Sequence, residues 1–222
     1  MSFKETALEI IREKIRGADW IREPLVGFAD ASSAHIRGIR SSVADDHLMP
    51  EDVLPEAEII ISYFLPFTKA AGECNRDGDF PSQLWADLYN KTNELIAEIN
   101  EALVSALEEA GVKAAIPAGG FDTDRLLSRW SQRHVAEAAG LGTFGLNNML
   151  ITKSGSMGRF GSVVTALKEG NATITLKVEI DGRTSSLVAS KRVMVKNEFV
   201  IEGQTLVAYK GLGGDVVIPD DK

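Results

Sequence analysis

Three glycines, Gly140, Gly142 and Gly145, fall within six residues and are followed by the pair Asn147 and Asn148. They come after a stretch with helical periodicity and before a short apolar run. Glycine has no Cβ, so the backbone amides of such a segment can come close to a flat or anionic ligand. The residue types and their spacing therefore indicate a ligand-binding loop.

A purely structural role explains the same glycines. Gly140 could end a helix, and Gly142 to Gly145 could form a tight turn. A dinucleotide site of the Rossmann type is disfavoured, because there the glycines follow a strand and open a helix. Here a helix is expected before the glycines and a strand after them, at residues 149–152. The ligand-loop and the structural interpretations both stay open.

Basic residues gather around the glycines, although the chain has a net charge of −8. Between positions 125 and 159 there is one acid, Glu137, and five basic residues: Arg125, Arg129, Arg133, Lys153 and Arg159. The three arginines lie four residues apart, which predicts a shared face of a helix over residues 124–139, capped by Asp122 or Thr123. Such a face could bind phosphate or carboxylate groups, or it could simply be solvated.

Composition excludes several classes of protein. The single cysteine, Cys74, allows no internal disulfide and no cysteine-based metal cage, and the three histidines lack the spacing of a zinc site. The acidic balance disfavours general binding of polyanions. No apolar run is long enough to cross a bilayer, and the N-terminus does not read as a signal peptide, so we expect a cytoplasmic protein without membrane contact.

Hydrophobic periodicity divides the first 168 residues into helices and strands. Helices are expected over residues 3–16 and from Trp85 to about Gly111, in addition to the one over 124–139. Strands are expected at 25–29, 59–65, 112–116, 149–152 and 160–167, with a loop or broken helix at 30–50 and a loop at 68–81.

The character of the chain changes after KEGNA at residues 168–172, which we interpret as a domain boundary between 1–168 and 172–222. From Thr173 apolar and polar residues alternate, and Asp181 and Gly182 predict the turn of a β-hairpin. Further strands are expected near Val193, Phe199, Leu206 and Val216. The second domain is therefore expected to be a small all-β meander.

The run AAGLGTFGLNNMLIT at 138–152, followed by GS at 155–156 and FGSVVT at 160–165, resembles the corrinoid-binding N-terminal half of epoxyqueuosine reductases. The resemblance covers about residues 20–166 and includes LVGFAD, LMPEDVLPEAEIIISYFLPF and FDT. It implies an α+β fold, with a nitroreductase-like mixed or antiparallel sheet flanked by helices. It also implies cobalamin as cofactor and a relation to the queuosine modification of tRNA.

The same resemblance implies roles for individual residues. An Asp before the glycine segment would donate a proton to the leaving oxygen of the epoxide, with Asp122 as the better positional match and Asp124 as the second. Apart from the resemblance, the predicted arginine face makes Arg125, Arg129 and Arg133 the residues expected to bind substrate. The residues expected to contact the cofactor are Gly140, Leu141, Gly142, Gly145, Asn147 and Asn148.

One departure from the family concerns electron transfer. Its reductases hold two iron–sulfur clusters with eight cysteines, whereas Cys74 is the single cysteine here, so no iron–sulfur cluster comes from this chain. We therefore expect a catalytically incomplete corrinoid-binding domain. The alternatives are a non-catalytic interaction or assembly module on the same scaffold and a flavin-binding nitroreductase-like protein.

The end of the chain has a resemblance of its own. The stretch EFVIEGQTLVAYKGLGGDVVIPDD at 198–221 resembles the entry strands of leucine-rich repeats of the BspA-like type. A single repeat leaves an unpaired edge and an apolar face, which needs a cover. The first domain or a second copy of the tail could supply one; we favour the second copy and therefore expect a homodimer through the β tail.

Overall fold

The computed structural model describes residues 3–118, 120–167, 169–180, 183–194, 200–202 and 205–208. The chain divides into two compact units, Met1–Ala166 and Leu167–Lys222. Among the described residues, no helix combines the length and the apolar character needed to cross a bilayer.

The first unit is organised on an antiparallel sheet with the strand order β1-β2-β8-β3. Its strands are β1 (Leu25–Asp30), β2 (Ile59–Pro66), β8 (Gly158–Thr165) and β3 (Ala114–Ala115). All eight residues of β2 are buried, because this run of β-branched and aromatic side chains lies between two other strands and has helices on both faces. Ser62 in its middle lies opposite Gly27 of β1 and Ser162 of β8.

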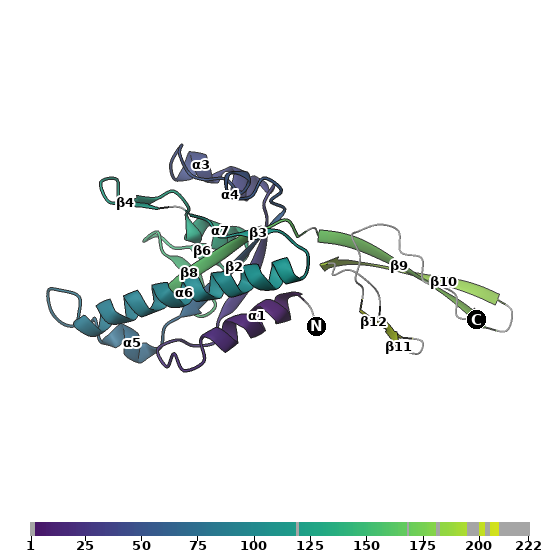
Figure 1. The fold of residues 1–222 in the computed structure, drawn as a ribbon, viewed down its shortest axis with the longest axis horizontal. Helices are drawn as coiled ribbons and strands as arrows, with labels where there is room; N and C mark the ends of the chain where they lie inside the picture. Colours follow the sequence, from purple (N-terminus) through teal and green to yellow (C-terminus); the bar gives the residue numbers. More distant parts are fainter. Residues whose placement is uncertain are drawn as a thin grey trace. The chain divides into compact units, whose positions relative to one another are not determined.

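Helices α1 (Phe3–Lys14) and α6 (Gln83–Glu109) cover one face of the sheet (Figure 1). Side chains alternate along β2, so Ile61, Tyr63 and Leu65 pack with the apolar stripes of these two helices. Ser82 caps α6 by accepting a hydrogen bond from the backbone N–H of Trp85 at 3.1 Å. The helix expected from Trp85 to Gly111 is therefore confirmed.

Four short helices belong to the other face: α2 (Ala34–Arg37), α3 (Ile39–Ser42), α4 (Pro50–Val53) and α7 (Gln132–Ala138). Their apolar residues form a second cluster with Ile60 and Phe64 of β2. Residues 30–50 are thus a broken helix, one of the two forms expected. In the segment 68–81, which was expected to be a loop, α5 (Lys69–Glu73) is helical, with Thr68 as its N-cap.

Two small hairpins complete the unit: β4 (Phe121–Asp122) with β5 (Leu127–Ser128), and β6 (Gly142–Phe144) with β7 (Leu150–Thr152). The predicted helix over 124–139 is therefore wrong in its first half. Asp122 accepts the backbone N–H groups of Asp124 and Arg125 at 2.9 and 3.0 Å, and Leu126 takes a left-handed φ of 53°. These contacts form a turn, so the helix begins only at Gln132.

The second unit contains a long antiparallel hairpin of β9 (Glu169–Ile180) and β10 (Arg183–Met194), in which Ile180 lies opposite Arg183. The predicted hairpin is confirmed, and its turn residues Asp181 and Gly182 lie outside the described residues. Residues 169–172 of the KEGNA segment, which was interpreted as a domain boundary, already belong to β9. The short strands β11 (Val200–Glu202) and β12 (Thr205–Ala208) also pair.

Helices and antiparallel sheets together confirm the α+β class. The nitroreductase-like assignment stays a prediction, as does the BspA-like character of the tail. The strand expected near Val216 lies outside the described residues.

Candidate functional site

The glycine segment forms the end of α7 and the β6–β7 hairpin. Gly140 has a left-handed φ of 71°, and its N–H donates to the carbonyl of Glu137 at 2.9 Å. The N–H of Leu141 then donates to the carbonyl of Ala136 at 3.0 Å. This is the hydrogen-bond pattern by which a glycine ends a helix, so the structural interpretation of Gly140 accounts for its type.

The other two glycines fit the geometry of the hairpin. A Cβ on Gly142 would lie 2.4 Å from the carbonyl oxygen of Ile151, so a side chain there would collide with β7. The N–H of Gly145 donates to the carbonyl of Met149 at 2.9 Å and closes the turn, in which Asn148 takes a left-handed φ of 58°. The hairpin itself therefore requires these residue types, whether or not a ligand binds.

The hairpin exposes apolar side chains. Leu146 at the turn is fully exposed, Ile151 is 52% exposed and Met149 is 41% exposed. Three large apolar side chains exposed on one hairpin form a surface that a partner or ligand would be expected to cover.

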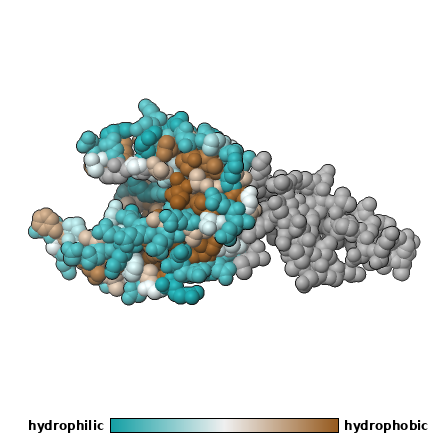
Figure 2. Space-filling view, in the orientation of Figure 1, coloured by the Kyte–Doolittle hydropathy of each residue, from teal (hydrophilic) through white to brown (hydrophobic). Residues whose placement is uncertain are grey.

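A cavity of about 240 Å³ lies beside this hairpin, where α7 and β8 begin. Its described lining holds two arginines and no acidic residue: Gln132, Arg133, Met149, Leu150, Ser156, Gly158, Arg159 and Phe160. Figure 2 shows the surface hollowed between the part of the molecule with β4 and the part with α5 and the start of α6, over the end of the sheet where β8 begins.

Each of the two arginines is held in place. Arg133 donates to the backbone carbonyl of Asn148 and so ties α7 to the hairpin turn. Arg159 donates to the side-chain carbonyl of Asn93 at 2.8 Å and lies 4.2 Å from the ring centre of Tyr89. A hydrogen bond between Arg159 and the Tyr89 hydroxyl, together with the positive charge of Arg159, lowers the pKa of that hydroxyl. The cavity is cationic, with both guanidinium groups already oriented.

The three histidines come together around α7, which sequence spacing did not reveal. His47 accepts the backbone N–H of Ser131 at 2.8 Å, and the hydroxyl of Ser131 lies 2.7 Å from Nδ1 of His134. His35 pairs with Glu137 at 3.0 Å. Burial lowers the pKa of both His47 and His134. Within the part of the chain that the structure describes, no group of three or more His, Cys, Asp or Glu side chains could hold a metal ion.

The similarity to known proteins is weak. No family model matches the sequence, and no curated protein is similar to it. One solved structure, the epoxyqueuosine reductase from Streptococcus thermophilus, is 20% identical, with a TM-score of 0.40 over 78% of this chain and 48% of that chain. The chain thus spans about half the length of that reductase.

The arginines predicted to share a helical face lie on separate elements, so that prediction is wrong. Arg125 is in the β4–β5 turn and donates to the carboxylate of Asp46 at 2.8 Å. Arg129 follows β5 and donates to the backbone carbonyl of Asp46 at 3.3 Å. Of the three, Arg133 alone is helical and lines the cavity at the start of β8. A role of these arginines in substrate binding stays a prediction.

The residues predicted to donate a proton or to contact the cofactor also lie in different parts of the first unit. Asp122 and Asp124 lie in the β4–β5 hairpin and are not in the lining of the cavity beside β8. Gly140 and Leu141 line a different cavity, next to α1. Gly145, Asn147 and Asn148 form the hairpin turn with its exposed apolar side chains. Three of the predicted cofactor contacts thus lie together in the hairpin turn, next to the cavity that Arg133 lines.

Proposed function

We propose that the first unit is a corrinoid-binding domain of the epoxyqueuosine-reductase type, which binds cobalamin and is catalytically incomplete by itself. The observation that carries the proposal is the placement of the motif AGLGTFGLNNMLIT. It forms a hairpin with exposed Leu146, Met149 and Ile151 next to a cationic cavity. The relation to tRNA queuosine modification rests on the sequence resemblance.

The residues present are suited to this cofactor. A corrin is a flat, largely apolar ring whose edge carries amide side chains. The exposed side chains of Leu146, Met149 and Ile151 would contact the ring, and the side-chain amides of Asn147 and Asn148 would bind its polar edge. The ring holds cobalt with its own nitrogens, so it needs no cluster of protein metal ligands.

The chemistry proposed for the domain is limited by its residues. When bound, the cobalt centre would supply electrons to an epoxide. Asp122 is the proposed proton donor, although its carboxylate already accepts two backbone hydrogen bonds that stabilise the β4–β5 turn. The single cysteine cannot hold an iron–sulfur cluster, so reduction by this chain requires an external reductant.

Titration of the purified full chain with cob(II)alamin tests the proposal. We expect the absorption spectrum to shift toward the base-off form as the cofactor binds. Leu146→Asn should weaken binding by at least about tenfold, because a Leu side chain contributes roughly 1.5–3 kcal/mol when it is buried. This variant should fold normally, since Leu146 is fully exposed. Gly142→Val is less suitable, because its side chain would disrupt the hairpin.

Ile116→Asn is the matched control, because Ile116 is also an exposed apolar residue and lines neither cavity. It should bind cob(II)alamin like the wild type. An unchanged spectrum at high protein concentration would contradict cobalamin binding. A parallel titration with flavin mononucleotide tests the flavin-binding alternative.

A non-catalytic interaction module is the second candidate, and the full exposure of Leu146 favours it specifically. In that case neither cofactor would bind, and Leu146 would belong to a protein interface.

A further inference from the structure

A second cavity, of about 440 Å³, lies beside β1 on the opposite side of the glycine segment from the hairpin turn. Because β1 is at the edge of the four-stranded sheet, α1 on one face and the end of α7 on the other leave the space along it open. The lining consists of Lys4, Leu8, Arg12, Glu23, Pro24, Leu25, Val26, Gly140, Leu141, Lys153 and Ser154. Its size is that of a small-molecule site.

The charge of this cavity is opposite to that of the chain. Three basic residues and one acidic residue line it, which gives a formal charge of +2 in a protein with a net charge of −8. Arg12 and Glu23 neutralise each other in an ion pair. The excess charge therefore belongs to Lys4 and Lys153, neither of which has a partner within the part of the chain that the structure describes.

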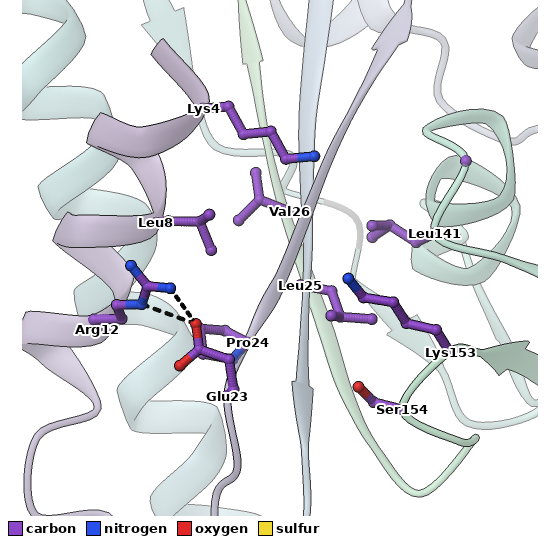
Figure 3. Close-up of a pocket in the computed structure, with 11 residues that line it drawn as sticks. Lys4, Leu8, Arg12, Glu23, Pro24, Leu25, Val26, Leu141, Lys153 and Ser154 are labelled. Atoms are coloured by element: carbon purple, nitrogen blue, oxygen red, sulfur yellow. Dashed lines mark hydrogen bonds and ion pairs between the residues drawn. The ribbon is translucent and has the colours of Figure 1, made fainter. Parts of the chain in front are cut away.

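The two lysines extend from opposite walls. Figure 3 shows the ammonium groups of Lys4, on α1, and Lys153, in the turn after β7, both directed toward β1. The apolar floor consists of Leu8 on the α1 side of β1 and of Leu25 and Leu141 on the side of Lys153 (Figure 3). A ligand whose anionic group lies between the lysines would place its apolar part on this floor.

Both walls are fixed by contacts outside the cavity. On one side, Ala7 and Ile11 of α1 are buried in the core under the helix. On the other side, Arg22 donates to the backbone carbonyls of Phe67 at 2.8 Å and Ser154 at 2.6 Å, and so anchors the turn that carries Lys153. The distance between the walls is therefore set by the fold and needs no ligand to establish it.

We propose that this cavity binds a small organic anion, with its carboxylate or phosphate group between Lys4 and Lys153 and its apolar part on Leu8, Leu25 and Leu141. The site lies beside β1 and α1 and uses neither the hairpin turn nor the arginine-lined cavity of the proposed corrinoid site. It shares with the predicted cofactor contacts only Gly140 and Leu141, which line the cavity beside β1. Two flexible lysines around an apolar floor suit an anionic group on a short hydrocarbon better than an extended polyanion.

Isothermal titration calorimetry of the full chain at low salt, with octanoate and octyl phosphate as probes, tests the proposal. We expect at least one of the two to bind, and the comparison shows whether the site prefers carboxylate or phosphate. Octanol and inorganic phosphate should each bind at least about tenfold more weakly, because each lacks one of the two interactions. Shortening octanoate to hexanoate should reduce affinity, by up to about fourfold per methylene lost from the apolar floor.

Lys4→Gln and Lys153→Gln should each weaken binding of the anionic probe by about tenfold, the usual effect of losing a charge-assisted contact. Both residues are exposed, so the variants should fold like the wild type. Lys69→Gln is the matched control, since Lys69 is an exposed lysine outside the cavity, and it should leave binding unchanged. The proposal is overturned if neither anion binds, if octanol binds as tightly as octanoate, or if the two lysine variants behave like the control.

Discussion

His47 is a buried titratable group whose environment requires the neutral form. It is 1% exposed, its Nε2 accepts the N–H of Ser131 at 2.8 Å, and its ring stacks on Trp130. Because Nε2 is an acceptor, the proton of the neutral ring sits on Nδ1, which has no hydrogen-bond partner among the described residues. A second proton would occupy Nε2 and break the contact with Ser131. Burial accordingly lowers the pKa of His47.

This environment predicts a loss of stability in weak acid. The pKa of His47 is lower in the folded than in the unfolded chain, where it is about 6.5, so the unfolded chain binds more protons in the interval between the two values. The full stability is present above about pH 6.5 and declines as the pH falls below it. Burial of His134 acts in the same direction. Urea unfolding at pH 7.5 and pH 5.5 measures the difference.

The variant His47→Gln should make this pH dependence smaller, because a Gln side-chain carbonyl can accept the Ser131 N–H and does not titrate. His35→Gln is the control, since His35 is exposed and paired with Glu137, and it should retain the dependence of the wild type. Equal pH dependence in the wild type and in His47→Gln would show that another group is responsible.

At the scale of elements, α7 packs closely on the sheet because small residues lie beneath it. Gly27, Ser62 and Ser162 are adjacent on three neighbouring strands, and the hydroxyl of Ser162 accepts the indole N–H of Trp130 at 3.0 Å and donates to Gln132 at 2.8 Å. A Cβ on Gly27 would lie 2.3 Å from the carbonyl oxygen of Ala139. The position of α7, and with it the glycine segment, therefore depends on this row.

Gly27→Ala should lower the free energy of unfolding by about 1–3 kcal/mol, the usual cost of overpacking a core, because the contact is with backbone that cannot rotate away. Denaturant unfolding of the variant measures the change. Gly120→Ala is the control, since a Cβ there would meet nothing within 4 Å, and its effect should be within about 0.5 kcal/mol. Equal stabilities would mean that α7 can shift without cost.

Elements with a long regular pattern could be predicted from sequence, and short ones could not. The eight buried residues of β2 and the apolar stripe of α6 are continuous signals, so both were predicted within a few residues. In the segment before α7, the spacing of Leu127, Trp130 and His134 matches a helix, but Leu127 belongs to β5. The hydrogen bonds of Asp122 and the left-handed Leu126 decide the local structure there, and hydrophobic spacing does not report them.

The candidate site, too, could be predicted from sequence only in part, because some of its contacts join residues that are far apart in the chain. The glycine segment is continuous in sequence, so its turn could be located, although the glycines proved to be required by the hairpin. The contact of His47 with Ser131 and the two lysines beside β1 join residues more than 80 positions apart. Such pairs carry no local signal, because only the tertiary fold brings them together.

At the scale of the whole molecule, the three apolar clusters of the first unit can be followed through the part of the chain that the structure describes. All of their described members lie between Ala7 and Ala166. The long β9–β10 hairpin begins at Glu169, after the last strand of the four-stranded sheet. The folding of the first unit should therefore not depend on the second.

Deleting residues 169–222 tests this independence. All three tryptophans, Trp20, Trp85 and Trp130, lie in the first unit, so their fluorescence reports its unfolding in the full and in the shortened chain alike. We expect the same urea midpoint for both chains, because no residue of the three clusters is removed. We also expect light scattering to show a dimer for the full chain and a monomer for the shortened one, since the edge strands of a two-stranded sheet pair readily between copies. A lower urea midpoint after deletion would mean that the second unit stabilises the first. If the shortened chain were still a dimer, the contact between copies would lie in the first unit.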